Sequence, residues 1–239
     1  FDGNPEYTIN SCATSRCFFG QFNFESEIMQ DQNIRKAIEM GIDKEGFCSV
    51  IMEGRGLPAK AAFPDSFSYG NEAVETVSYD PEGAKKLLEE SGWKDTDGDG
   101  YADKDGQKLT IDWLTYPTRL EQPKLAEYAQ ATLKEIGIDV VVNNTSDHMT
   151  YAADGNFDVY VSSTTTAPTG DPEYFFTSTV VGPKNYGKYE NKEVTALTEK
   201  LHQAFEPEER AKLATELQQK ILDDDGFFFV SHLNMGIVT

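Results

Sequence analysis

The chain has 239 residues, of which 38% are hydrophobic and 26% are charged, and its formal net charge is -20. Its surplus of carboxylates disfavours binding to nucleic acid or to anionic membranes, and no apolar stretch approaches the roughly 20 residues of a membrane-spanning helix. These properties favour one large α/β domain with an acidic, solvated surface, since domains commonly run to roughly 100–200 residues.

The N-terminal third predicts helices separated by a loop. Apolar residues recur at helical spacing from 33 to 47, with a break at Gly41 and Asp43 placed to cap a second short helix. Residues 54–69 are rich in Gly, Pro and Ser and are expected to form a loop. A clearer helix begins with Asp80 as N-cap, has proline at its first position and ends at a glycine, Gly92.

Three cysteines are too few for a disulfide framework. Cys12 and Cys17 are close enough in sequence to pair locally, which would leave Cys48 as a small buried residue. Their spacing has no matching second half, so the sequence does not indicate a zinc site.

An acidic, glycine-rich loop spans 94–106 and contains DTDGDGYADKDG. Aspartates at alternate positions followed by glycine are typical of the start of a calcium-binding loop, but Gly106 stands where an EF-hand has its bidentate glutamate. An ordinary turn is the competing interpretation, because Asp and Gly are good turn formers. The candidate calcium ligands are Asp95, Asp97, Asp99 and Asp103.

The remaining elements alternate between helix and strand. Four segments predict strands, at 109–113, 138–142, 157–161 and 227–230, and the last is apolar throughout, as in a sheet interior. Four others predict helices, at 123–136, 148–153, 194–205 (with Phe205 on the apolar stripe) and 213–221. This alternation predicts an α/β fold with a mixed or parallel sheet flanked by helices.

No catalytic motif is present in the sequence. The three histidines, His148, His202 and His232, form no ligand-spaced pair, and each is expected to be structural. Neither a nucleophile elbow nor a phosphate-binding loop occurs. The sequence therefore gives no support to an enzyme.

Taken in order, six segments resemble family 5 of the extracellular solute-binding proteins, the peptide and nickel class. They are DQNIRKAIEMGIDKEGF, GRGLPAKAAFP, SYDPEGAKKLLEESGW, LAEYAQATLKEIGIDVVV, GNFDVYVSSTTTAPTGDPEYFF and the two helices and strand that close the chain. The resemblance implies a lobe like those of type II periplasmic binding proteins, which close on a ligand by a hinge. Because both ends look cut, residues 1–239 are expected to be the single C-terminal lobe of a larger two-lobed protein.

The resemblance also implies a function. The parent protein would be the substrate-binding component of an ABC importer, a monomer that captures nickel chelates or short peptides outside the cell and delivers them to permease subunits. It would be a cell-surface lipoprotein or a periplasmic protein. Two alternatives remain open: a surface interaction domain that kept the fold, and a hydrolase.

The resemblance places the ligand site on the loop after the strand at 157–161. Peptide-binding members have an anchoring aspartate where Pro168 stands here, while Ala167, Pro168, Gly170 and Pro172 resemble the nickel branch. That branch has aromatics where Thr169 and Glu173 stand and a metal-contacting histidine later in the lobe, whereas this chain has no histidine between 157 and 200. The candidate ligand-binding residues, expected to leave the strand end as a polar loop, are Ser162, Ser163, Thr164, Thr165, Thr166, Thr169, Asp171 and Tyr174. A weaker second candidate is the group His232, Asn234 and Met235.

Overall fold

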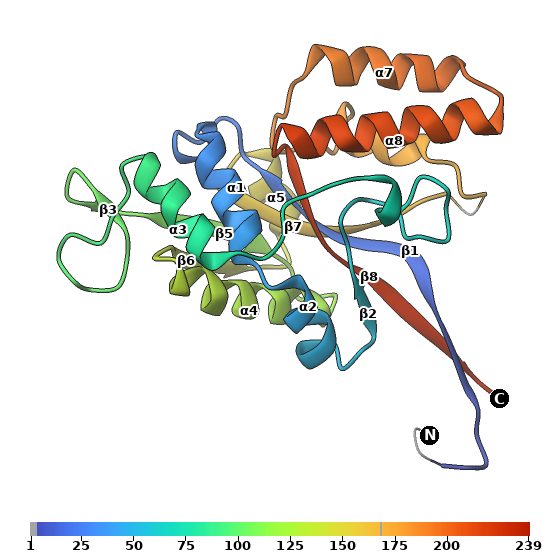
Figure 1. The fold of residues 1–239 in the computed structure, drawn as a ribbon, viewed down its shortest axis with the longest axis horizontal. Coiled ribbons are helices and arrows are strands. Elements are labelled where there is room, and N and C mark those ends of the chain that lie inside the picture. Colours follow the sequence, from blue (N-terminus) through green and yellow to red (C-terminus); the bar gives the residue numbers. More distant parts are fainter. Residues whose placement is uncertain (1–3, 168) are drawn as a thin grey trace.

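The computed structural model describes residues 4–167 and 169–239 as strands and helices around a mixed sheet (Figure 1). The strands are β1 (Ile9–Phe22), β2 (Gly56–Pro58), β3 (Asp103–Lys104), β4 (Gln107–Lys108), β5 (Thr110–Thr115), β6 (Asp139–Asn144), β7 (Val159–Thr165) and β8 (Phe227–Val238). The α-helices are α1 (Gln32–Gly41), α2 (Lys44–Gly46), α3 (Pro81–Glu90), α4 (Glu121–Glu135), α5 (His148–Ala153), α6 (Glu173–Phe175), α7 (Lys192–Gln203) and α8 (Pro207–Asp223). Short 3-10 or π turns lie at Ile28–Gln30, Phe47–Ile51, Asn71–Ala73 and Phe176–Val180.

The sheet is mixed, as the sequence predicts. Its strand order is β2-β8-β1-β7-β5-β6, and β3 with β4 forms a separate hairpin. Strand β5 runs parallel to both β6 and β7, while β1 is antiparallel to β7 and β8. Helices cover both faces of this sheet, so the predicted fold, a lobe of the type II periplasmic-binding-protein kind, is confirmed.

Alternate side chains of the central strands pack into two separate hydrophobic cores, one on each face of the sheet. Phe228 and Val230 of β8 pack with Trp113 under α1, α3 and α4, whereas Phe227 and Phe229 pack on the opposite face with α7 and α8. Both faces of β8 are therefore buried, which explains its unbroken apolar run.

The predicted helix signals are confirmed at several ends. The Asp43 side chain accepts a hydrogen bond from Gly46 N, and the Asp80 side chain accepts one from Gly83 N. Helix α4 begins two residues before the predicted start, and α5 has the predicted bounds. Phe205 lies beyond the end of α7 and is 86% exposed, so its assignment to the apolar stripe was wrong. The 54–69 loop also contains β2, which pairs with β8.

Strand β1, in the centre of the sheet, was absent from the sequence prediction. Its first residues are exposed, its middle is half-buried, and its last part, from Cys17 to Phe22, is buried between β7 and β8. The local pairing of Cys12 with Cys17 that the sequence left open is not formed: both thiols are free, Cys12 is exposed and Cys17 is fully buried. The two residues lie five positions apart on one extended strand, too far for a disulfide. Cys48 is buried, as predicted.

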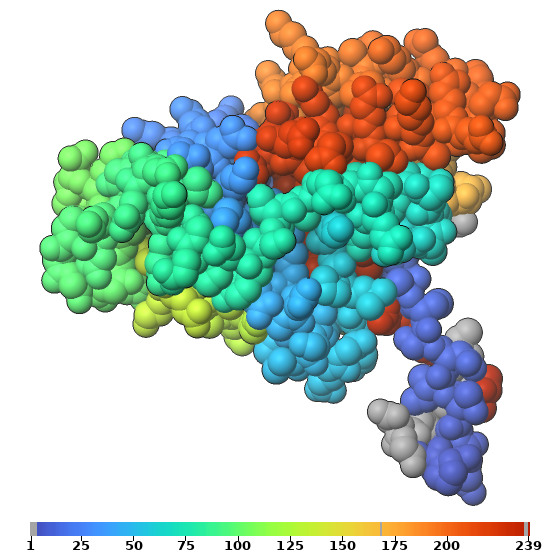
Figure 2. All heavy atoms as spheres, viewed as in Figure 1, coloured from blue at the N-terminus to red at the C-terminus, as the bar shows by residue number. Residues whose placement is uncertain are grey.

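The N-terminal part of β1 and the C-terminal part of β8 pair as a two-stranded ribbon, in which Ile9 faces Val238 and Ala13 faces Asn234. The ribbon projects from the body as a thin arm, while the acidic loop lies at the other end of the molecule (Figure 2). Because β1 is antiparallel to β7, the ribbon continues past the carboxyl end of β7. Among the described residues, no helix has both the length and the apolar character needed to cross a membrane.

Candidate functional site

The predicted hydroxyl residues lie mainly in a strand rather than in a loop. Strand β7 extends to Thr165, and its residues from Ser162 onward pair with β1, where Phe19 faces Ser162 and Arg16 faces Thr165. The expectation that Ser162, Ser163, Thr164 and Thr165 form a loop was therefore wrong. Pairing with β1, which the sequence did not reveal, holds these side chains in a fixed register.

Three of these hydroxyl residues line a hollow of about 210 Å³ at the carboxyl ends of β5 and β7. Ligands bind at this edge in open α/β sheets. Ser163 Oγ lies 3.4 Å from Tyr116 Oη, and Arg16 Nη1 donates to Ser163 Oγ at 3.5 Å. The lining residues are Phe19, Gln21, Tyr116, His148, Met149, Tyr160, Ser162, Ser163, Thr164, Thr179, Lys184 and Tyr186.

An imidazole forms part of the hollow's wall. The His148 ring stacks on Tyr116 with a centroid separation of 4.2 Å, and His148 Nδ1 lies 2.7 Å from Tyr160 Oη. Desolvation by burial lowers the pKa of His148 and raises that of Tyr160, so both side chains are neutral near pH 7. The sequence prediction of a purely structural role for His148 did not foresee this position at the hollow.

The loop after β7 is anchored by an arginine on α8. Arg210 Nη2 donates to both oxygens of Asp171, at 2.7 and 2.8 Å, and to Glu173 Oε2 at 3.1 Å. The Asp171 carboxylate also accepts from Glu173 N, as expected for an aspartate before a helix start. The Asp171 carboxylate is therefore already hydrogen-bonded within the chain, by Arg210 and by Glu173 N. The ion pair with Arg210 ties the loop to the α7–α8 hairpin.

The other predicted loop residues lie outside the hollow's lining. Thr166 Oγ1 donates to the Asp171 carbonyl at 2.7 Å, and Thr169 is exposed. The Tyr174 hydroxyl accepts from Lys184 Nζ at 3.0 Å, and this contact lowers the pKa of Tyr174. Pro168, which occupies the position of the peptide anchor, lies outside the described residues.

Several residues of the hollow were missed by sequence reasoning. The lining residues Tyr116, His148, Lys184 and Tyr186 come from segments that are far apart in the chain, and so does Arg16, which donates to Ser163 beside the hollow. No local spacing joins them: the sheet order brings the ends of β1, β5 and β7 together, His148 comes from α5, and Lys184 and Tyr186 come from the segment before α7. Of the weaker candidate group, His232 is fully buried and accessible to no ligand, whereas Asn234 is half-buried and Met235 is exposed.

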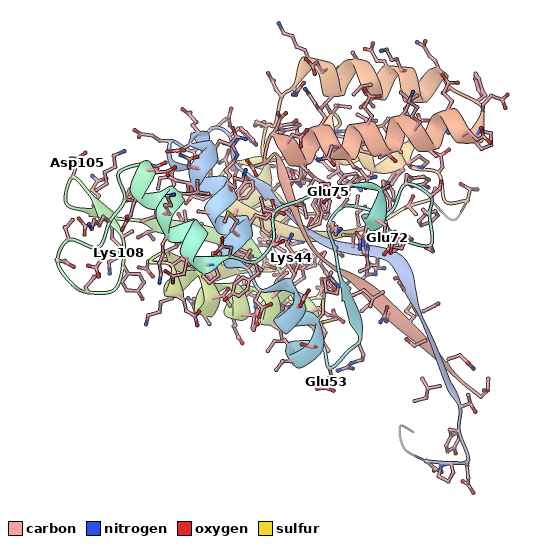
Figure 3. All side chains as sticks on the ribbon, in the orientation of Figure 1. Lys44, Glu53, Glu72, Glu75, Asp105 and Lys108 are labelled. Carbon is pink, nitrogen blue, oxygen red and sulfur yellow. The ribbon has the colours of Figure 1, made fainter. Side chains whose placement is uncertain are left out.

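The acidic loop brings three of its four predicted ligands together. Asp95, Asp97 and Asp99 each offer a carboxylate oxygen within 4.8 Å of the others. Asp103 faces Thr96 instead, accepting from Thr96 N at 2.8 Å and from Thr96 Oγ1 at 2.6 Å. Lys108 Nζ lies 2.9 Å from Asp99 Oδ2 and competes for one of the three carboxylates. In Figure 3 the labelled Asp105 and Lys108 mark this end of the molecule.

The chain is similar in sequence to characterised binding proteins over most of its length. The chain is 28% identical to the oligopeptide-binding protein AppA of Bacillus subtilis over 95% of its own length and 43% of that protein. It is 29% identical to the nickel-binding protein NikA of Staphylococcus aureus over 78% of its length and 36% of that protein. The chain thus spans less than half the length of these curated relatives.

Solved structures show the same fold. AppA of Bacillus subtilis, in complex with a nonapeptide, matches with a TM-score of 0.84 and 24% identity over all of this chain and 49% of that one. A nickel ABC transporter protein from Bacillus halodurans matches with a TM-score of 0.86 and 23% identity over 99% of this chain and 50% of that one. The family model described as bacterial extracellular solute-binding proteins, family 5 Middle, matches residues 1–187. The chain therefore belongs to family 5 of the bacterial extracellular solute-binding proteins.

Proposed function

We propose that this chain is the C-terminal ligand-binding lobe of the substrate-binding component of an ABC importer. The ligand is a nickel chelate or a short peptide, and the complete protein is a monomer that delivers it to permease subunits. The parent protein is a cell-surface lipoprotein or a periplasmic protein. Family membership supports the transport role, and the names of the relatives supply the two ligand classes.

The observation that carries this proposal is the position of the hollow beside the ribbon. The hydroxyl row of β7 lies at the edge past which β1 and β8 project, so a second lobe attached through this ribbon would face the hollow. The ligand-binding residues are then Ser162, Ser163 and Thr164, with Thr165, Thr166, Thr169, Asp171 and Tyr174 on the adjoining strand end and loop.

We propose further that the lobe binds without catalysis. Within the described part of the chain, each histidine side chain contacts a tyrosine, a carboxylate or an amide, and none is hydrogen-bonded to a serine or cysteine nucleophile. A hydrolase of the acyl-transfer type needs that contact to activate its nucleophile. The surface-interaction alternative remains, and it predicts no ligand in the hollow.

Native mass spectrometry of the full-length protein, purified from its host, tests the transport role. A co-purified mass equal to that of a peptide, or one with a nickel isotope pattern, is the expected result. Release of the ligand on unfolding, and its absence after substitution of Ser163 and His148 together, would locate it in the hollow. A protein that repeatedly carries no ligand and takes none up would contradict the proposal and favour the surface-interaction alternative.

The acidic loop is proposed as a calcium site that stiffens the hairpin of β3 and β4. Carboxylates of Asp95, Asp97 and Asp99 would supply hard oxygen ligands. For a Kd of about 10⁻⁴–10⁻³ M, 10 mM calcium would stabilise the folded chain by about 1–3 kcal/mol and raise its Tm by several degrees.

Thermal unfolding of chelator-treated protein with and without calcium measures this effect. The variant Asp97→Asn should lose the calcium-dependent rise in Tm. Asp105→Asn is the matched control, because Asp105 lies in the same loop but outside the group of three, and asparagine tolerates its φ of 53°. If calcium leaves the Tm of the unmodified chain unchanged, the loop is an ordinary turn.

A further inference from the structure

Strand β6 forms an open edge of the sheet. It is the last strand in the order and pairs only with β5. Asp139 N and Thr145 N donate to carbonyls on the β5 side, and backbone groups alternate in direction along a strand. The N–H and C=O groups of Val142 and Asn144 therefore point away from β5, where no described residue pairs with them. Such an edge is a template for a further strand.

Little of this edge is protected. The outward carbonyl of Val140 accepts from Gln130 Nε2 of α4 at 2.7 Å, so α4 covers only the first part of the strand. Natural edges are commonly blunted by lysine, proline or a bulge. Strand β6 contains neither residue and keeps a continuous register with β5, and its Val141 is 48% exposed. The remainder of the edge is open to a partner strand.

An acidic hollow of about 630 Å³ adjoins this edge. Val141 and Asn143 of β6 line it together with Leu114 of β5. Its described lining contains four carboxylates and no lysine, arginine or histidine; the four are Glu25, Asp112, Asp154 and Asp158. The hollow reaches the start of β7, whereas the ribbon and the proposed ligand site lie at the carboxyl end of that strand. It is therefore a separate surface.

Three of the four carboxylates have no partner. Asp158 accepts from Ser26 Oγ and, at 2.8 Å, from Asp112 N. Within the described part of the chain, the side chains of Glu25, Asp112 and Asp154 form no hydrogen bond and no ion pair. Burial, and then the negative charge of Asp158, raise the pKa of Asp112, so these two carboxylates repel each other. A cationic side chain among them would relieve this repulsion through charge-assisted hydrogen bonds.

We propose that β6 and the acidic hollow form a docking surface for an extended, basic segment of a partner protein, which adds to the sheet beside β6 and directs Lys or Arg side chains into the hollow. Strands lie about 4.8 Å apart, so the added strand would lie about 10 Å from β5, a distance that a long cationic side chain and Asp112 can bridge together. Backbone hydrogen bonds would supply affinity, and alternate cations would supply specificity. A second copy of this chain is a poor occupant, because its net charge is -20 and its own hollow is acidic. The inference goes beyond the proposed transport function.

Hydrogen exchange of the full-length protein, followed amide by amide, tests the inference. The probe is the blocked peptide acetyl-Val-Lys-Val-Arg-Val-amide, whose cations share one face of an extended strand. At about 90% occupancy the amides of Val142 and Asn144 should exchange about tenfold more slowly than in the free protein, since exchange then proceeds from the unbound fraction. A peptide with glutamate in place of both cations, or one with methylated backbone nitrogens, should have no such effect.

Variants assign the binding to the hollow. The double variant Asp112→Asn, Asp154→Asn should bind the peptide at least about tenfold more weakly, because it lacks two of the charged acceptors. The matched control is Asp147→Asn, Glu127→Gln, which removes two exposed negative charges from α4 and the start of α5, outside the hollow, and should bind as the unmodified protein does.

Three results would overturn the inference. They are unchanged exchange at Val142 and Asn144 with the peptide present, slowing that survives in the Asp112→Asn, Asp154→Asn variant, and slowing confined to residues 162–164 of the ligand hollow. Slowing that appears without peptide as the protein concentration rises would also overturn it, by assigning the edge to a second copy. None of these results bears on the transport function, which native mass spectrometry tests independently.

Discussion

Replacing Arg35 with alanine is expected to destabilise the chain by about 3–5 kcal/mol, the cost of removing one side of a buried, fully hydrogen-bonded charged group. Arg35 lies on α1 and is only 6% exposed. Its guanidinium donates to the carbonyls of Met29, at 2.7 Å, and of Asp224 and Asp225, each at 3.0 Å. It also lies 4.5 Å from the centroid of the Phe24 ring.

These contacts join the two halves of the fold. Helix α1 packs in the core under α3 and α4, whereas Asp224 and Asp225 form the turn between α8 and β8, which borders the other core. Truncation would leave several buried carbonyls without donors, and each buried unsatisfied group costs about 1–3 kcal/mol. The loss should therefore appear as reduced global stability rather than as local fraying.

Urea unfolding followed by circular dichroism measures the effect. Arg35→Lys should recover little of the loss, because one ammonium cannot reproduce the planar fork that reaches carbonyls on two segments. Lys36→Gln is the control, since it removes a neighbouring positive charge on the same helix without these bonds. A loss below about 1 kcal/mol for Arg35→Ala, or full recovery with lysine, would contradict this account.

Local sequence signals were sufficient to predict most of the helices. Caps such as Asp80 and the apolar spacing of α4 act within a few residues, so they can be recognised before any tertiary contact is known. The apolar run at Phe227–Val230 was recognised as a buried strand for the same reason, since both of its faces are covered.

Strand β1 was missed because its structure depends on its neighbours. Residues from Asn10 to Arg16 are polar or small, have no alternating hydrophobic pattern and are exposed or half-buried. They become a strand by pairing with β7 and β8, which are distant in sequence. The same pairing extends β7 to Thr165, and so changed the predicted polar loop into an ordered row of hydroxyls.

The candidate site was therefore predicted in part. The sequence directed attention to Ser162, Ser163 and Thr164, which do line the hollow, because polar residues after a buried strand indicate a ligand edge. It did not identify Arg16, His148 or Lys184, since these residues come from β1, α5 and the segment before α7, which only the tertiary fold brings to β7.

Lowering the pH from 7 to 4 is expected to remove about 3 kcal/mol of the free energy of unfolding through His232 alone, because its pKa is lower in the folded chain than in the unfolded chain. His232 is fully buried, and its Nε2 lies 3.3 Å from Asn71 Oδ1. Desolvation lowers the pKa of His232 from 6.5 to about 4, an effect that nearby Asp65 partly opposes. Because the imidazole binds a proton more weakly in the folded chain, the unfolded chain takes up more protons between these two pH values, and stability falls as the pH falls.

Comparison with His232→Gln isolates this contribution from those of other groups. The variant retains an amide near Asn71 but cannot titrate, so its free energy of unfolding should decline less steeply than that of the unmodified chain between pH 6.5 and pH 4. Buried acids such as Asp225, whose pKa is raised mainly by desolvation, act in the opposite direction and are present in both proteins. The difference between the two urea-unfolding series therefore reports His232 itself. Parallel declines in the two proteins would mean that the imidazole reaches solvent and is protonated in the folded state, and that the β8 strand opens at the point where the ribbon leaves the sheet.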